Sequence, residues 1–405
     1  YIYDSFDKSL PEGFYNKKAM LYIMDAETER FVLKPKGMGE RRAGHLNLSD
    51  FCDRKSIKGM GYYCSTEQKG MLLHTCIAVT DQGIPLGILY QETNTRETRK
   101  DDSETKEQKK ARPIEEKESF RWLKTMKETH KRVPEDIRVL TVCDREGDFY
   151  ELFSEAAHLG ADFLVRIVQN RMINDGKKIF NELRSCPAAG SMVIRMGRNP
   201  KEHIPSRNIK MDYHYKEVEI HCPKRRKEEH LQEKLVLTAV YVHESGKKAT
   251  EWFLLSTVKI KGEKDVKKLI ECYAHRWKIE RFHYILKSGC KIEKNQAREY
   301  ERLQFLTLLY SVIAMQILNL TYLGKICPEL SSEVVFDEDE WKILYCCARK
   351  TKEIPQTYTL KEAIYDLGIL GGMKGAPSDG MPGARPIWQG LEVLCALLAY
   401  RNYIV

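Results

Sequence analysis

The segment YAHRWKIERFHYILK, residues 273–287, surrounds a single acid with basic and aromatic side chains. Four residues fall within a stripe of roughly 60° on one helix, at about 100° per residue: Tyr273, Arg276, Glu280 and Lys287. Apolar residues gather on another side and predict the face toward the core: Cys272, Ile279, Phe282 and Leu286. One face would present an acid between two cations and a phenol. A solvated face with an ordinary i,i+4 ion pair between Arg276 and Glu280 is the alternative.

A second acid, Asp144, stands in TVCDREGDFYELF, residues 141–153. It ends the apolar segment IRVLTVCD (137–144), which predicts a buried strand. An acid at the carboxyl end of a core strand is a usual place for a site in an α/β sheet. The alternative is that Asp144 or Asp148 caps the helix that follows.

Together the two acids indicate a metal-dependent reaction on phosphate esters. Asp144 and Glu280 lie far apart along the chain, but they can meet if the segment between them loops out. Carboxylates are hard oxygen ligands that suit Mg²⁺ or Mn²⁺. Two such ions, about 3.5–4 Å apart, can clamp the attacking and leaving oxygens of a phosphoryl transfer. The cations near Glu280 would then hold backbone phosphates.

The surrounding pattern predicts a mixed α/β core that a β block interrupts. Two apolar runs flank TDQG within residues 70–91 and predict a hairpin, and residues 115–133 predict an amphipathic helix. Short alternating segments between 161 and 260 predict a mostly antiparallel β block, after which helices resume and continue to about 323. The tail places a Gly/Pro-rich turn between two helical stretches, whereas residues 29–44 show no clear period and predict a loop or disrupted sequence.

Composition favours a cytosolic protein with an anionic partner. The 405 residues carry a formal charge of +9, and nucleic acid is the commonest partner of basic proteins. Twelve cysteines without a Cys-x-x-Cys pair indicate reduced thiols rather than a zinc site or a disulfide framework. No signal peptide is evident, and the longest apolar run, 305–323, holds polar residues that favour a buried helix over a membrane span. We therefore expect no membrane partner.

The pattern Tyr-x-x-Arg-x-x-x-Glu-x-x-x-x-x-x-Lys resembles the signature of bacterial insertion-sequence DDE transposases of the cut-and-paste, hairpin-forming group. VCDREGD resembles the motif of their second aspartate, and KGMLLHTCIAVTDQGIPLGIL resembles the hairpin after the first. LGGMKGAPSDGMPGARPIWQGLEVL resembles the C-terminal region that pairs two subunits. The resemblance spans roughly residues 55–395.

The resemblance implies a ribonuclease-H-like core, a mixed sheet flanked by helices, with a β-rich insertion and a helical C-terminal region. The domain boundaries that it implies are a truncated or disrupted segment 1–44, core residues 45–160, insertion 161–260, core residues 261–325 and a dimerisation region 326–405. It implies catalysis by Asp144 and Glu280 with two Mg²⁺ or Mn²⁺ ions bound to them. The partners would be the terminal inverted repeats of the element, target DNA and a second copy of the chain. The location would be the bacterial cytoplasm, at the nucleoid.

Further residues match DNA-contacting positions of the family. Tyr273, Arg276 and Lys287 belong to its signature, and Arg166 in FLVRIV matches an arginine that contacts DNA. Trp252 in EWFLLS matches an aromatic that stacks on a base flipped out of the hairpin, which is worth about 1–3 kcal/mol per base. The alternatives are a surface arginine and a core tryptophan.

The chain departs from the family at the first catalytic aspartate. The family has an Asp-Thr-Thr-like motif roughly thirty residues before the histidine that matches His74, but that place falls on Arg42 to His45. The nearest acids are Glu40, Asp50 and Asp53. The sequence therefore predicts a DDE transposase that could be an inactive copy. A DNA-binding descendant without catalysis and a ribonuclease-H-like nuclease unrelated to mobile DNA are the other hypotheses.

Overall fold

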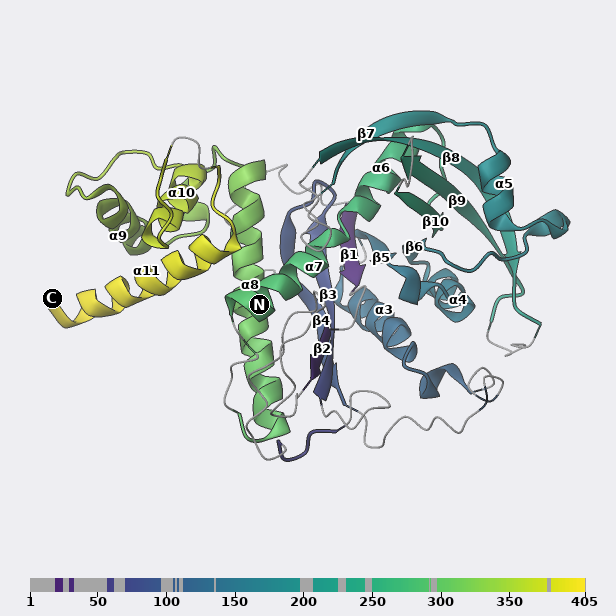
Figure 1. Ribbon diagram of the computed structural model, residues 1–405, viewed down its shortest axis with the longest axis horizontal. Coiled ribbons are helices and arrows are strands. Elements are labelled where there is room, and N and C mark those ends of the chain that lie inside the picture. Colours follow the sequence, from purple (N-terminus) through teal and green to yellow (C-terminus); the bar gives the residue numbers. More distant parts are fainter. Residues whose placement is uncertain are drawn as a thin grey trace, which may run out of the picture.

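The computed structural model describes most of the chain from residue 70 onward and short segments before it. The described residues are 19–24, 29–32, 57–61, 70–95, 105, 108, 112–134, 136–196, 207–224, 231–244, 250–290, 292, 297–376 and 380–404. Figure 1 shows a sheet-containing part joined through the long helix α8 to a smaller helical part at the C-terminal end.

Ten strands of the described residues form one continuous sheet. The strands are β1 (Ala19–Met24), β2 (Glu29–Val32), β3 (Gly70–Thr80), β4 (Pro85–Asn94), β5 (Arg138–Cys143), β6 (Asp162–Arg166), β7 (Gly190–Met196), β8 (Arg207–His221), β9 (Lys234–Glu244) and β10 (Glu251–Ser256). Their order is β2-β3-β1-β5-β6-β10-β9-β8-β7, and β4 pairs with β3. Residues before and after the β block therefore share a sheet with it.

The first half of this sheet confirms the predicted ribonuclease-H-like core. β3 and β4 form the predicted hairpin, with His74 opposite Glu92, and β1 lies antiparallel to β3. β1, β5 and β6 then run parallel to one another. Nearly every residue of β3 is buried, which fits a central strand that is covered on both faces.

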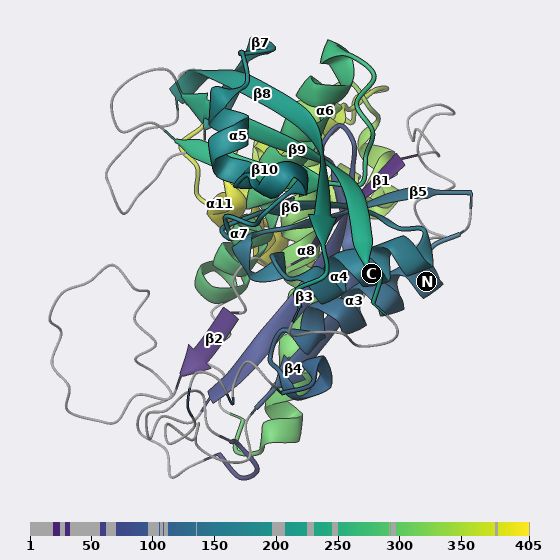
Figure 2. The ribbon, with the colours of Figure 1, turned by 90° about the vertical axis from the view of Figure 1, so that its right-hand side faces the viewer.

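The second half is the predicted antiparallel block. β10 pairs antiparallel with β6 and β9, and β9, β8 and β7 continue as an antiparallel meander. Figure 2 shows these strands curling away from β3 and β4. A short helix that the sequence patterns did not predict, α5 (Ile179–Ser185), packs against β8 and β9.

Helices cover the core half and form the C-terminal part. They are α3 (Phe120–Arg132), α4 (Tyr150–Leu159), α6 (Glu263–Ala274), α7 (Trp277–Tyr284), α8 (Tyr300–Ile326), α9 (Glu338–Arg349), α10 (Leu360–Leu370) and α11 (Ala384–Ile404). In Figure 1, α6 and α7 run diagonally from the β7–β10 strands to α8. The predicted strand 137–144, helix 115–133 and paired tail helices are thus confirmed.

The long apolar helix α8 is half buried within the fold. By length and composition alone, it is the one helix of the described residues that could cross a membrane. Its polar side chains bind the hairpin instead: Asn319 donates to the Pro85 carbonyl at 2.6 Å, and Gln304 donates to Thr93 Oγ1 at 2.6 Å. Such side-chain contacts with β4 fit the predicted core helix.

Two glycines allow α10 and α11 to touch at their backbones. A Cβ on Gly371 would lie 1.9 Å from the Pro386 carbonyl oxygen, and a Cβ on Gly390 would lie 2.0 Å from the Leu367 carbonyl oxygen. Real Cβ atoms do not approach that closely, so only glycine fits at either place. The predicted Gly/Pro-rich turn therefore returns the chain into close contact with α10.

The N-terminal residues differ from the expectation. Residues 29–32 form strand β2 rather than a loop, and β1 and β2 join the core sheet although we had assigned both to a separate segment, 1–44. Residues 33–56, which include Glu40, Arg42, His45, Asp50 and Asp53, lie outside the described residues. The other domain boundaries stay a prediction.

Candidate active site

Asp144 lies at the carboxyl end of β5 and begins the 3-10 turn η3 (Arg145–Gly147). Its carboxylate accepts a hydrogen bond of 2.8 Å from the Glu146 amide, so the capping alternative describes a real contact. The side chain is only 8% exposed. Burial raises the pKa of Asp144 to about 6, while the Glu146 amide and the nearby Arg276 act in the opposite direction. A buried acid with a raised pKa is typical of a functional site.

Asp148 fixes the loop that carries Asp144. Its buried carboxylate accepts hydrogen bonds from the Val168 and Gln169 amides, at 2.7 and 2.8 Å, and forms an ion pair with Arg171. These contacts join the loop after β5 to the chain after β6. Asp148 therefore stabilises this loop. Asp144 is the remaining aspartate that could take part in chemistry at the end of β5.

We expect Asp148→Ala to destabilise the fold by roughly 2–4 kcal/mol, because it leaves two amides and the Arg171 guanidinium without their acceptor. Urea unfolding monitored by circular dichroism measures this loss. Glu155→Ala is the control, since Glu155 makes a more exposed ion pair with Lys127 and should cost at most about 1 kcal/mol. Equal losses for both variants would contradict the anchoring role of Asp148.

The opening segment is not one continuous helix. α6 ends at Ala274, a turn covers His275 and Arg276, and α7 begins at Trp277. The predicted core face is confirmed, because Cys272, Ile279, Phe282 and Leu286 are all buried. Tyr273, Arg276 and Glu280 lie close together, as the predicted stripe requires, because Arg276 Nη2 donates to Glu280 Oε1 and Tyr273 acts on Arg276. The face is not solvated, however, because Tyr273 and Arg276 are only 2% and 7% exposed.

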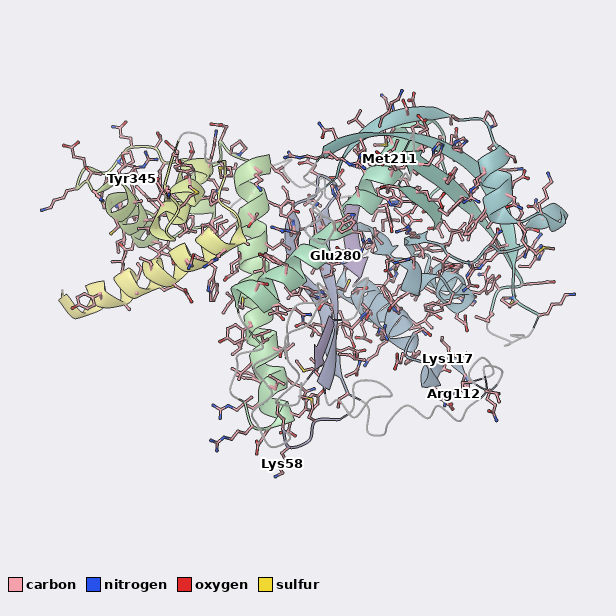
Figure 3. All side chains as sticks on the ribbon, in the orientation of Figure 1. Lys58, Arg112, Lys117, Met211, Glu280 and Tyr345 are labelled. Carbon is pink, nitrogen blue, oxygen red and sulfur yellow. The ribbon has the colours of Figure 1, made fainter. Side chains whose placement is uncertain are left out.

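Arg276 links the two acids. Its Nη2 donates to Glu280 Oε1 at 2.8 Å, and its charge acts on Asp144 and Glu280 alike. The Glu280 side chain is 41% exposed, so it faces solvent while Asp144 lies deeper. Figure 3 places Glu280 near the centre of the molecule, on the helix that crosses the sheet. The structure thus brings Asp144 and Glu280 together around one guanidinium.

Tyr273 connects this group to the insertion strands. Its ring meets the Trp252 ring edge-on, with centroids 5.1 Å apart, and Arg166 lies within hydrogen-bonding reach of its hydroxyl. Burial raises the pKa of Tyr273, whereas Arg276 and Arg166 oppose the rise. Trp252 is 3% exposed, which is the core position that we named as its alternative. The roles of Trp252 and Arg166 on DNA stay predictions.

Lys287 follows α7 in a π-helical turn, Ile285–Gly289. Such turns are rare and occur frequently at functional sites. The turn shifts Lys287 relative to Glu280 from the place that a regular helix would give it. Lys287 is half-buried, and its contact with DNA stays a prediction.

A buried lysine lies on the inner side of α7. The Lys278 Nζ is 2.9 Å from His275 Nδ1 and 4.8 Å from the centre of the Tyr322 ring. Burial lowers the pKa of Lys278 to about 7 and that of His275 to about 3, so His275 is neutral at pH 7 and its Nδ1 can accept from Lys278. The charge of Asp81 acts on His275, and Asp81 itself pairs with Lys268 at 3.0 Å.

We expect Lys278→Met to stabilise the protein at pH 7 by roughly 1–3 kcal/mol. The folded-state pKa of Lys278 lies below its unfolded value of 10.5, so the unfolded chain binds the extra proton between about pH 7 and 10.5. The lysine therefore lowers stability most at and below pH 7, and its effect fades toward pH 10. Urea unfolding of both proteins at about pH 7 and pH 9.5 should show a difference that shrinks. A difference that stays constant would contradict this assignment.

Two family models match consecutive parts of the chain. The model described as "Transposase DDE domain" matches residues 116–316, and the model described as "Transposase Tn5 dimerisation domain" matches residues 312–404. The first range holds Asp144, Arg276 and Glu280, and the second begins within α8 and ends at the last residue of α11. The chain belongs to the DDE transposases. The predicted family is confirmed at this level.

One solved structure is similar to this chain over much of the chain's length. It is a cryo-EM structure of the piggyBac transposase synaptic complex with hairpin DNA, 12% identical, with a TM-score of 0.35. The match covers 78% of this chain and 48% of that one, so this chain spans about half the length of the piggyBac chain.

At the site of this transposase, Asp144 and Glu280 are ligands of the type that a divalent ion prefers, but two described carboxylates are fewer than such a site usually has. Asp144 and Glu280 offer the hard oxygens that Mg²⁺ and Mn²⁺ prefer. Within the described ranges, however, no group of three or more His, Cys, Asp or Glu side chains could hold a metal ion. A third acid would have to come from outside these ranges.

The position of β1 in the transposase points to an acid that the sequence patterns missed. β1 runs parallel to β5, with Ala19 opposite Arg138 and Ile23 opposite Val142. In the sequence, an aspartate at position 25 directly follows β1, as Asp144 directly follows β5, and residue 25 lies outside the described residues. The signal was present in LYIMD, an apolar run ending in an acid, as in LTVCD. We missed it because we expected the first acid about thirty residues before His74.

Proposed function

We propose that this protein catalyses metal-dependent cleavage and strand transfer at the ends of an insertion sequence, by the cut-and-paste route with a hairpin intermediate. The observation that carries the proposal is the meeting of Asp144 and Glu280 around Arg276, from elements far apart in the sequence. A ribonuclease-H-like core with one acid at a strand end and a second acid on a helix near it suits phosphoryl transfer on DNA.

We propose that Asp25 supplies the first carboxylate. Strand β1 supports this assignment, because it runs parallel to β5 and pairs with it, and Asp25 follows β1 in the sequence as Asp144 follows β5. Asp25, Asp144 and Glu280 would hold the divalent ions. Bound there, the ions would activate the attacking oxygen and stabilise the leaving oxygen.

The basic and aromatic residues of the site would position the DNA. The buried Arg276 has an Nε–H with no hydrogen-bond partner among the described residues, which could donate to a phosphate beside the reacting one. Lys287 and Arg166 would bind backbone phosphates. Trp252 would need the Tyr273 contact to open before its ring could stack on a flipped base.

The partners would be the terminal inverted repeats of the element, a target duplex and a second copy of the chain. The match to a Tn5 dimerisation domain at residues 312–404 supports the dimer, which we expect only in the DNA complex. We expect the protein to act on the bacterial nucleoid, in the cytoplasm.

An excision assay tests the proposal. A supercoiled plasmid carrying the gene with its natural flanks is incubated with the protein and Mg²⁺ or Mn²⁺, and with EDTA as the control. We expect release of the element, with ends that snap back on a denaturing gel because they are closed as hairpins. Salt-dependent binding of the plasmid without any cut in either metal would instead identify a DNA-binding descendant without catalysis.

A further inference from the structure

Two histidines on neighbouring insertion strands face each other across β8 and β9. The Nε2 atoms of His214 and His243 lie 3.2 Å apart, and the centres of their rings lie 5.4 Å apart. His214 pairs with Tyr241 in the strand register and His243 pairs with Asp212, so the two imidazoles are diagonal neighbours on one face of the sheet. We call them the histidine pair.

A backbone contact fixes the tautomer of His214. Its Nδ1 is 2.7 Å from the carbonyl oxygen of Cys186, and a carbonyl can only accept, so Nδ1 carries a proton. Neutral His214 therefore has its lone pair on Nε2, the atom that faces His243. The two Nε2 atoms can share one proton or bind one metal ion together, whereas two N–H groups in that position would repel each other.

The spacing of the two nitrogens suits a transition-metal ion. Zn–N bonds of about 2.0–2.1 Å at a tetrahedral angle place two nitrogen ligands about 3.3 Å apart. The observed separation is 3.2 Å, so both imidazoles could bind one ion with almost no movement of the strands. A histidine that binds a metal almost always donates its other ring N–H to a carbonyl, a carboxylate or water, and His214 donates to Cys186 in this way.

The surroundings of the histidine pair favour a cation. The strand register places Asp212 of β8 and Glu251 of β10 on either side of His243, although Glu251 also pairs with Arg184. His214 is buried and His243 is half-buried, so the site is reached from the His243 side. In the part of the chain that the structure describes, no third His, Cys, Asp or Glu completes a metal-binding group, so water would supply the other ligands.

We propose that the histidine pair is a binding site for a divalent transition-metal ion, and for Zn²⁺ in particular. Imidazole nitrogens suit Zn²⁺, Cu²⁺ and Ni²⁺, whereas carboxylates such as Asp144 and Glu280 suit Mg²⁺ and Mn²⁺. The ion would join β8 to β9 and, through Cys186, to the end of α5, which packs on both strands (Figure 1). The site is independent of the proposed function, because it shares no residue with the site that would cleave DNA.

Calorimetric titration of the untagged full chain with Zn²⁺ tests the site, with excess Mg²⁺ present to occupy the catalytic carboxylates. We expect one equivalent of Zn²⁺ to bind to the wild type, and this binding to be weakened at least about tenfold in H214Q and in H243Q. Lowering the pH from about 7.5 to 5.5 should weaken it as well, because protons compete with the metal for imidazole. The half-buried His243 keeps the test valid if H214Q fails to fold, which circular dichroism would show.

The matched control is H221Q, which removes a more exposed histidine of the same strand, β8. His221 contacts Glu219 at 3.3 Å and has no part in the pair, so H221Q should bind Zn²⁺ as the wild type does. Zn²⁺ should also raise the unfolding temperature of the wild type and H221Q, but not that of H243Q.

Two outcomes would overturn the site. One is a wild type that binds no Zn²⁺. The other is equal binding by the wild type, H214Q and H243Q, which would place the ion elsewhere, for example on exposed thiols such as that of Cys347. Neither outcome would affect the excision assay, whose result depends on the catalytic acids.

Discussion

Asp144→Asn and Glu280→Gln should each reduce metal-dependent cleavage by about 10³-fold or more, with DNA binding retained. Each substitution keeps the shape of the side chain and removes one anionic ligand from the ion. In the Glu280→Gln protein the new amide oxygen can still accept from Arg276, so the 2.8 Å contact between α7 and its N-terminal arginine can persist. The measurement is single-turnover cleavage of a labelled element end in Mg²⁺ and in Mn²⁺.

Glu146→Gln is the control for this pair. Glu146 lies two residues from Asp144 and pairs with Arg121 at the surface, and its amide, which caps Asp144, is unaffected by the change. Its cleavage rate should stay within a few-fold of the wild type.

Metal-free Asp144→Asn should also unfold no earlier than the wild type, since it removes a charge that burial disfavours. An active Asp144→Asn protein would contradict the site.

Asp25→Asn should reduce cleavage as strongly as Asp144→Asn does, because both acids would hold the same ions. The acids in the region where the family's motif was expected serve as matched controls: Glu40→Gln, Asp50→Asn and Asp53→Asn. These should cleave at near wild-type rates. Loss of activity in Asp50→Asn with an active Asp25→Asn protein would assign the first acid to residue 50 instead.

A second readout for Asp25 does not depend on DNA cleavage. When H₂O₂ and ascorbate are added, Fe²⁺ that replaces Mg²⁺ reduces H₂O₂ to hydroxide and a hydroxyl radical and becomes Fe³⁺, which ascorbate reduces again. The radical cuts the polypeptide next to the bound ion. We expect fragments that end near residues 25, 144 and 280, and we expect Asp25→Asn to weaken all three together. Fragments near 144 and 280 alone would show that position 25 does not reach the ion.

The sequence by itself determined the elements and the two acids of the described site. Alternation and turn residues are local, so the 70–91 hairpin, the strand ending at Asp144 and the helix after residue 263 could be predicted from neighbouring residues. Residue spacing in the 273–287 segment drew attention to Glu280 and its basic neighbours but left an ordinary i,i+4 ion pair open, and only Asp144 and the family resemblance favoured a catalytic role.

Tertiary structure decided what those residues face. Packing against the sheet buries Tyr273 and Arg276 and brings Asp144 close enough for Arg276 to act on it, which the helical pattern alone does not show. The pairing of β1 with β5 depends on contacts between segments more than a hundred residues apart in the sequence. Local sequence patterns fix local geometry, whereas such juxtapositions depend on how the sheet pairs and how the helices pack against it.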